Sequence, residues 1–185
     1  MIAYKFLTRD GRGPITLWPW PRPSAGAEGA WVEAGGPLGL CRHGVHACRV
    51  DELVYWIHED LWRVELNGPF VEGQDCVVAA RARLVGRIEA WSGGGAQRFA
   101  VAVRDHAAAQ IAHHPERPRL QGYVDDASWH VDNGFPESPA LAALCSAMAV
   151  AQTQAGPGSG DPVESAYRRE RAWQSAWIAR EMRLT

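Results

Sequence analysis

The residues from Val78 to Ala90 alternate between apolar and charged side chains more regularly than the rest of the chain. A strand places successive side chains on opposite faces, so this alternation is typical of a strand with one face in the core. The apolar face carries Val78, Ala80, Ala82, Leu84, Ile88 and Ala90, and the charged face carries Arg81, Arg83, Arg87 and Glu89. Such a half-buried strand favours an antiparallel sheet, with a bend expected at Gly86.

Shorter apolar runs predict further strands at Ile2–Leu7, Ile15–Trp18, Trp31–Glu33 and Leu61–Leu66. Ser92–Gly95 is interpreted as a hinge, after which the pattern becomes helical. The expected apolar sides of three helices are Phe99, Val103, Ala107 and Ile111; Leu141, Leu144, Cys145 and Met148; and Tyr167, Trp173, Trp177 and Ile178. Gln154–Gly160 is expected to be a Gly-rich linker before a cap at Asp161. This order predicts an α+β fold, a mainly antiparallel N-terminal sheet covered by C-terminal helices.

The length of 185 residues fits one domain, 1–185, with a sheet-rich half at 1–91 and a helical half at 96–185. Four cysteines are too few for a disulfide scaffold, so a reducing, cytoplasmic location is expected. No secretory signal and no apolar run of membrane-spanning length is present, so no membrane association is expected. The net charge of −2 argues against a general nucleic-acid binder.

The densest group of chemically versatile residues is the stretch Cys41–Cys48, which reads C-x-H-x-x-H-x-C. A hairpin with His43-Gly44 at its turn would place Cys41 opposite His46, with Cys48 on the same face. The two cysteine Cα atoms would then be roughly 7–8 Å apart, too far for an unstrained disulfide.

A metal ion is one explanation of this arrangement, because two thiolates and an imidazole are ordinary zinc ligands. Cys41, His46 and Cys48 would be ligands of zinc or iron, with His43, Cys76 or water as the fourth. A second explanation is a reactive thiol whose pKa is lowered by His46. A third is that the cysteines and His46 are small or satisfied core residues.

Several residues outside this stretch are candidates for ligand binding or catalysis. Lys5 is the only lysine beside 18 arginines, and it could contact an anion or act as an amine. Glu65 lies inside a predicted strand and is a candidate acid or base, with a solvated strand face as the alternative. Trp62 is a candidate pocket residue, since tryptophan often lines ligand sites.

Arg81, Arg83 and Arg87 could together bind a phosphate or carboxylate, although such a row is more often solvated. The segment with Asp125, Asp126, His130 and Asp132 could bind a divalent cation, but it lacks the spacing of an EF-hand. The sequence leaves the role of this acidic segment open.

The N-terminal half resembles an uncharacterised family of phage and bacterial proteins. The resemblance rests on Tyr4-Lys5-Phe6-Leu7, on the C-x-x-G-x-H-x-C pattern of Cys41, Gly44, His46 and Cys48, and on Val64-Glu65 with Gly68. The helix from Arg168 to Ala179 resembles the ending of actinobacterial members. The resemblance covers most of residues 1–91 and implies no activity.

The chain also resembles ADP-ribosyltransferase-type folds, in which a strand with G-x-H precedes a short helix and a returning strand. The resemblance implies a nucleotide-handling enzyme that would use the face of Arg81, Arg83 and Arg87 for phosphates. The chain lacks the Arg, Ser-Thr, Glu set and the His–Tyr–Glu set of those enzymes.

The leading hypothesis is an enzyme-like site for a small molecule in a tryptophan-lined pocket beside the cysteine–histidine stretch. His46 and Glu65 would be its catalytic residues, and Lys5, Arg81, Arg83 and Trp62 would bind the ligand. The alternatives are a non-catalytic interaction module, with a structural zinc or without metal, and the nucleotide-handling enzyme. The sequence indicates neither the substrate nor the oligomeric state.

Overall fold

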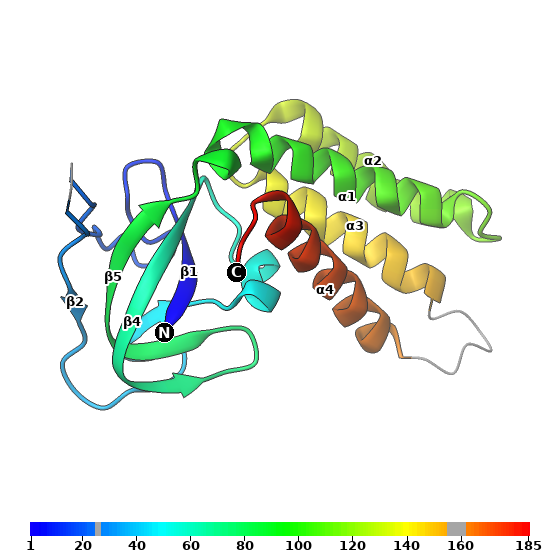
Figure 1. Ribbon diagram of the computed structural model, residues 1–185. Coiled ribbons are helices and arrows are strands. Elements are labelled where there is room, and N and C mark those ends of the chain that lie inside the picture. The colour runs from blue at the N-terminus through cyan, green and yellow to red at the C-terminus, as the bar shows by residue number, and fades with distance from the viewer. Residues whose placement is uncertain (25–26, 155–161) are drawn as a thin grey trace. The chain divides into compact units, whose positions relative to one another are not determined.

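The structure, a computed structural model, describes residues 1–24, 27–154 and 162–185. The chain divides into two compact units, which are described separately: unit 1 is Met1–Gly93 with Thr185, and unit 2 is Gly94–Leu184. Unit 1 contains an antiparallel sheet and unit 2 contains helices, which confirms the predicted α+β class (Figure 1). The single-domain organisation stays a prediction. Most of the predicted linker, and the predicted cap Asp161, lie outside the described residues.

Unit 1 is built on a five-stranded sheet in which β5 holds the central position. The strands are β1 (Ile2–Leu7), β2 (Val32–Glu33), β3 (Val45–Ala47), β4 (Asp60–Glu72) and β5 (Val77–Arg87), with a 3-10 helix, η1 (Val50–Tyr55), between β3 and β4. One edge of β5 pairs with β4, and the other pairs with β3 and then β2 (Figure 1). The long alternating segment of the sequence therefore organises the sheet.

The predicted strand at Ile15–Trp18 is wrong, because this segment forms turns. Leu17 adopts a left-handed φ of 56°, and its N–H donates to the carbonyl of Gly13, so the chain folds back too tightly to pair with a neighbour. Ile15 is 80% exposed. The segment is a loop at the surface of unit 1.

The core face of β5 changes phase part-way along the strand. The apolar cluster contains Val77 and Ala79, and then Ala82 and Leu84, whereas the sequence predicts Val78 and Ala80 on that face. The change occurs where β4 and β5 lose regular pairing, between Asn67 and Phe70 of β4, at a bulge. The extra residue of this bulge lies in β4, and period-two counting along β5 does not reveal it.

Strand β1 is buried on both faces, as its composition of mostly apolar residues allows. Tyr4 and Phe6 point to one side of the sheet, and Ala3 and Leu7 belong to the apolar cluster on the other. Alternation places Lys5 on the same side as Ala3 and Leu7. The only lysine of the chain is therefore half-buried on the side of the sheet that carries this apolar cluster.

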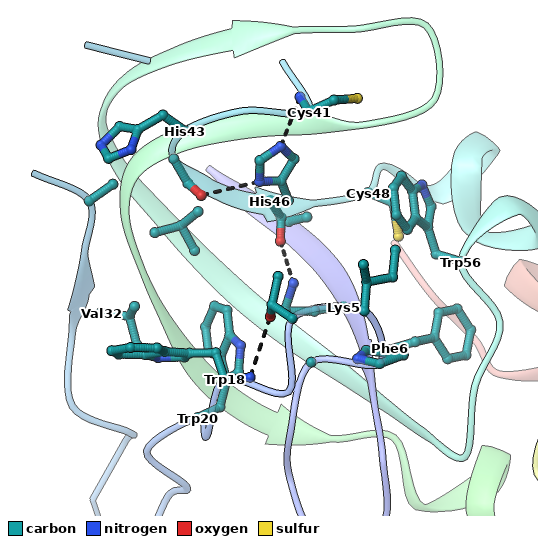
Figure 2. Close-up of a pocket in the computed structure, with 18 of the residues that line it drawn as sticks. Lys5, Phe6, Trp18, Trp20, Val32, Cys41, His43, His46, Cys48 and Trp56 are labelled. Atoms are coloured by element: carbon teal, nitrogen blue, oxygen red, sulfur yellow. Dashed lines mark hydrogen bonds between the residues drawn. The ribbon is translucent and has the colours of Figure 1, made fainter. Parts of the chain in front are cut away.

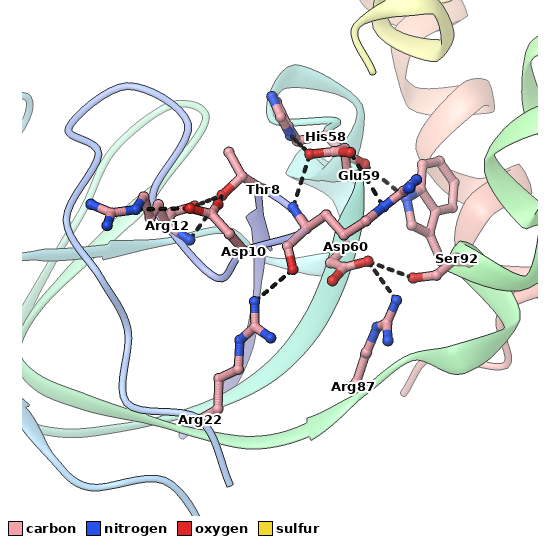
Figure 3. Close-up of polar contacts among 11 residues, drawn as sticks. Thr8, Asp10, Arg12, Arg22, His58, Glu59, Asp60, Arg87 and Ser92 are labelled. Carbon is pink, nitrogen blue, oxygen red and sulfur yellow. Dashed lines mark hydrogen bonds and ion pairs between the residues drawn. The ribbon is translucent and has the colours of Figure 1, made fainter. Parts of the chain in front are cut away.

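A buried carboxylate fastens the beginning of β4 to the end of β5 (Figure 3). Asp60 is 3% exposed, and its Oδ1 accepts hydrogen bonds from Arg87 Nη2 at 2.7 Å and from Ser92 Oγ at 2.8 Å. Next to it, Glu59 accepts a hydrogen bond of 2.8 Å from the backbone N–H of Arg9. The hydrogen bonds from Arg87 and Ser92 compensate the buried charge of Asp60.

Unit 2 contains, among its described residues, the helices α1 (Ala96–Ile111), α2 (Arg117–Asn133), α3 (Ser138–Gln154) and α4 (Val163–Glu181). The segment of the predicted hinge, Ser92–Gly95, lies in a π-helical turn, η2 (Trp91–Gly95), which leads directly into α1, and the boundary between the two units falls within it. The apolar face predicted for α1 is confirmed: Phe99, Val103, Ala107 and Ile111 are buried. No helix in the described part of the chain has the length and apolarity that crossing a bilayer requires.

The buried face of α3 differs from the predicted one. Leu141 and Leu144 are 38% and 41% exposed, whereas Ala143 and Ala147 are fully buried. Helix α3 contacts α1, α2 and α4, and small side chains allow three helices to approach it closely. Helix packing geometry therefore overrides the hydrophobicity of the leucines.

Helix α4 buries polar side chains that the sequence does not identify as core residues. Glu170 is 3% exposed, and its Oε2 lies 3.2 Å from Nε2 of His106, whose ring stacks on Trp173. Gln174 donates from Nε2 to Glu170 Oε1 and to the carbonyl of Ala143. Burial raises the pKa of Glu170, and His106 opposes that rise.

A pair of substitutions in α3 tests this packing. We expect Ala147→Leu to lower the free energy of unfolding by about 1–3 kcal/mol, because the added atoms have no space among the helices. Leu144→Ala should change it by less than about 1 kcal/mol, because the leucine is half-exposed. Urea unfolding followed by far-UV circular dichroism measures both. The opposite ranking would place Leu144 in the core.

Candidate ligand-binding site

Unit 1 contains a pocket of about 770 Å³, within the range of about 300–1,000 Å³ that small-molecule sites occupy. Its walls come from β1, the loop from Gly13 to Trp20, the β2 segment from Val32 to Gly35, the stretch Cys41–Cys48 and the segment Tyr55–Ile57 (Figure 2). Trp18, Trp20 and Trp56 contribute flat apolar surface. The pocket therefore lies beside the cysteine–histidine stretch and includes three tryptophans.

Lys5 is a half-buried amine in the wall of this pocket. Its Nζ donates a hydrogen bond of 2.7 Å to the backbone carbonyl of His46 and lies 5.0 Å from the ring centroid of Trp20 (Figure 2). The partner of Lys5 across the β1–β4 ladder is Trp62. An ammonium group is thus held among apolar and aromatic side chains.

Burial lowers the pKa of Lys5 from its ordinary value of 10.5 to about 8, and the nearby Cys48 acts weakly in the opposite direction. No carboxylate among the described residues contributes to this shift. The charged form of Lys5 is therefore poorly compensated by the protein itself.

His46 organises the loop above Lys5 instead of presenting a free imidazole. Its Nε2 accepts a hydrogen bond of 3.2 Å from the backbone N–H of Cys41, and its Nδ1 lies 3.1 Å from the carbonyl of Gly44 (Figure 2). The two bonds together require the neutral ring with its proton on Nδ1. Burial is the main cause that lowers the pKa of His46, which also favours the neutral form.

The predicted hairpin centred on His43-Gly44 is wrong. The loop closes instead between Gly39 and His43, whose backbone groups exchange two hydrogen bonds. Cys41 adopts a left-handed φ of 56°, and β3 pairs with β5 and not with a strand before the turn. Cys41 and His46 therefore meet through a backbone N–H and an imidazole, not as cross-strand neighbours.

The residues predicted as metal ligands are not gathered into one group in the described part of the chain. Cys48 is buried, and its thiol donates to the carbonyl of Tyr4, while Cys41 is exposed. Both ring nitrogens of His46 are engaged, and His43 lines the pocket as an exposed residue. Within the described ranges, no three His, Cys, Asp or Glu side chains are gathered as metal ligands would be.

The reactive-thiol alternative also lacks support from the geometry. Burial raises the pKa of the Cys48 thiol well above its usual value, and desolvation raises that of Cys76 as well. A neutral buried thiol is a weak nucleophile. The structure therefore favours Cys48 as a core residue.

The predicted site residues on β4 and β5 do not line this pocket. Arg83 forms ion pairs with Glu65 and Glu28, at 2.5 Å each, and its guanidinium lies over the ring of Trp31. Arg81 pairs with Glu33 at 3.7 Å and donates to Asn67. Both arginines therefore have carboxylate partners in unit 1.

Trp62 is a core residue, and the acidic segment lies elsewhere. Trp62 is 7% exposed and belongs to the apolar cluster of unit 1. Asp125, Asp126, His130 and Asp132 lie along helix α2 in unit 2, where Asp125 accepts a hydrogen bond from Gln121. The described residues gather no metal-binding group there.

Of the predicted site residues, Lys5, Cys41, His43, His46 and Cys48 come together in the pocket, and Glu65, Trp62, Arg81 and Arg83 do not line it. The sequence does not single out Trp18, Trp20 and Arg42, which line it as well. The run Pro19-Trp20-Pro21 could have indicated that Trp20 lies in an irregular segment suited to a pocket wall, because prolines keep this segment extended and out of regular structure.

Comparison of the chain with models of protein families, with curated proteins and with solved structures gives no match. The resemblance to a phage and bacterial family stays a prediction.

Replacing the lysine by an apolar side chain of similar length tests whether its charge lowers stability. We expect Lys5→Met to raise the free energy of unfolding at pH 7 by about 1–3 kcal/mol, because a poorly compensated charge leaves the core while one hydrogen bond is lost. Urea unfolding of the two proteins at matched pH measures the difference.

The gain should shrink as the pH rises from about 8 to 10.5. In that range the folded protein loses the Lys5 proton before the unfolded chain does, so the parent becomes relatively more stable. A variant less stable than the parent at pH 7 would show that the hydrogen bond to His46 outweighs the burial of the charge.

Proposed function

We propose that the protein binds a small organic anion with a flat apolar body in the pocket of unit 1. Lys5 carries this proposal, because a half-buried ammonium group without a carboxylate partner among the described residues can be compensated by an anionic ligand. The tryptophans of the pocket would contact the apolar body of the ligand.

The charges along the pocket wall support an anion. Lys5 and Arg42 line the pocket, and Glu33 is the only carboxylate among the lining residues. Glu33 lies 3.7 Å from Arg81 Nη1, so its charge is partly compensated. The charged side chains of the lining are therefore mainly positive, which favours a negatively charged ligand.

The tryptophans support a flat apolar body. Trp20 is 8% exposed and packs in the core cluster, whereas Trp18 is 59% exposed at the pocket rim. Val32 and Ile57 add aliphatic surface to the same cavity. A planar ring can stack on these surfaces and remove them from water.

The pocket offers binding groups but no assembled acid–base pair. His46 has both ring nitrogens engaged, and Glu65 lies outside the lining. The proposal is therefore one of ligand binding, and the enzyme-like part of the sequence hypothesis is not needed to account for the pocket.

Binding of 2-naphthoate, measured by isothermal titration calorimetry, tests the proposal against the neutral analogue 2-naphthylmethanol. We expect saturable binding of the anion at one site and binding of the alcohol that is about tenfold weaker or more. Lys5→Met should weaken binding of the anion until it equals binding of the alcohol. Trp18→Ala should weaken binding of both ligands roughly three- to tenfold.

Trp129→Ala is the matched control, because Trp129 is 54% exposed on α2 in unit 2 and does not line the pocket. It should leave both dissociation constants unchanged. Equal affinity for acid and alcohol, or an equal loss in Trp129→Ala, would contradict the proposal.

A further inference from the structure

The geometry points to a covalent role for Lys5: its amine condenses reversibly with the carbonyl group of an aromatic aldehyde bound in the pocket, forming an imine. This inference rests on the proposed ligand pocket and adds a substrate class to it, namely aldehydes with a flat apolar body.

The amine is held in place before a ligand arrives. Lys5 shares one side of β1 with Ala3 and Leu7, which belong to the apolar cluster, and it is half-buried there. The Nζ atom has one hydrogen bond, to the carbonyl of His46, and the ring of Trp20 beside it. A fixed amine in the wall of a cavity loses little conformational freedom when it attacks a bound carbonyl.

The surroundings also favour the neutral amine, which is the nucleophilic form. With a pKa of about 8, roughly half of the Lys5 side chains are neutral at pH 8, against less than about one in a hundred for an ordinary lysine. The other titratable side chains that line the pocket are Tyr4, Glu33, Cys41, Arg42, His43, His46, Cys48 and Tyr55. Among these, Cys48 is the group whose charge acts on Lys5.

The choice of residue agrees with amine chemistry. The chain uses arginine at 18 positions and lysine at one. A guanidinium binds anions at least as well as an ammonium, but it stays protonated and does not form imines. Of the two cationic side chains, only lysine has the primary amine that imine formation requires.

The reaction is balanced without a further reactant. The nitrogen of Lys5 adds to the carbonyl carbon, the two amine hydrogens leave with the carbonyl oxygen as water, and a carbon–nitrogen double bond remains. No redox step occurs, and addition of water reverses the reaction.

Reductive trapping tests the inference. The full-length protein is incubated at pH 8 with 6-formyl-2-naphthoate and sodium cyanoborohydride, which delivers hydride to the imine carbon while solvent supplies the proton to nitrogen. Intact-mass spectrometry should show a gain equal to the aldehyde minus one oxygen atom. Peptide mapping should place this adduct on Lys5, the only lysine of the chain.

Three controls make the result specific. Lys5→Arg keeps the charge and should lose the adduct at that position, while the N-terminal amine reports background labelling in both proteins. A free peptide with the sequence of Ile2–Leu7 should be labelled at its lysine at least about tenfold more slowly at pH 8. Excess 2-naphthoate should slow labelling of the protein and not of the peptide.

The outcomes separate this inference from the proposed function. If 2-naphthoate binds in a Lys5-dependent manner but Lys5 is labelled no faster than the peptide, imine formation is excluded and the anion site stands. If 2-naphthoate does not bind, the proposed function fails. Labelling of Lys5 that 2-naphthoate leaves unchanged would overturn the assignment of the reaction to the pocket.

Discussion

The pairing of β4 with β5 is the constraint on which the pocket depends. β4 pairs on its other edge with β1, which sets the position of Lys5 opposite Trp62. β5 pairs on its other edge with β3 and β2, which brings two further walls to the same cavity. Gly44 shows how closely the loop approaches β5, because a Cβ atom there would lie 2.1 Å from Val78 Cγ1. Three walls are thus fixed by one strand pair.

Lys5 departs from the apolar pattern on its side of β1. Ala3 and Leu7 occupy the same side of β1 and belong to the apolar cluster, so an apolar side chain at position 5 would continue the core. Burial of the ammonium group instead lowers its pKa, which means that the charged form destabilises the folded state. Violations of core patterning in folded proteins concentrate at functional sites. The lysine is therefore the best indicator of function in unit 1.

Much of the fold follows from periodicity in the sequence. The apolar run at Ile2–Leu7, the alternation around β5 and the helical spacing from Phe99 to Ile111 each reflect one regular element with a buried face. Periodicity fails where tertiary contacts decide. The core side of β5 changes next to the bulge in β4, and close packing around α3 selects alanines over leucines.

The site was only partly predictable for a related reason. The sequence shows that Cys41, His46 and Cys48 are close along the chain, but the function of a histidine depends on which atoms meet its two nitrogens. Here these partners are backbone groups of Cys41 and Gly44, in a loop where Cys41 has a left-handed φ. Residue spacing alone cannot distinguish a histidine that bonds to backbone groups of its own loop from a histidine that binds a metal, because both use the same side chain.

The presence of lysine at position 5, and not arginine or methionine, bears on which ligand the pocket binds. Arginine would keep its charge permanently in the core, so lysine is the cation that a buried position tolerates best. Tolerance alone does not explain a cation, because an apolar side chain would be more stable at the same place. A cation retained beside apolar side chains is therefore the main support for the proposed anionic ligand, and the tryptophans and aliphatic groups of the lining support a flat apolar body.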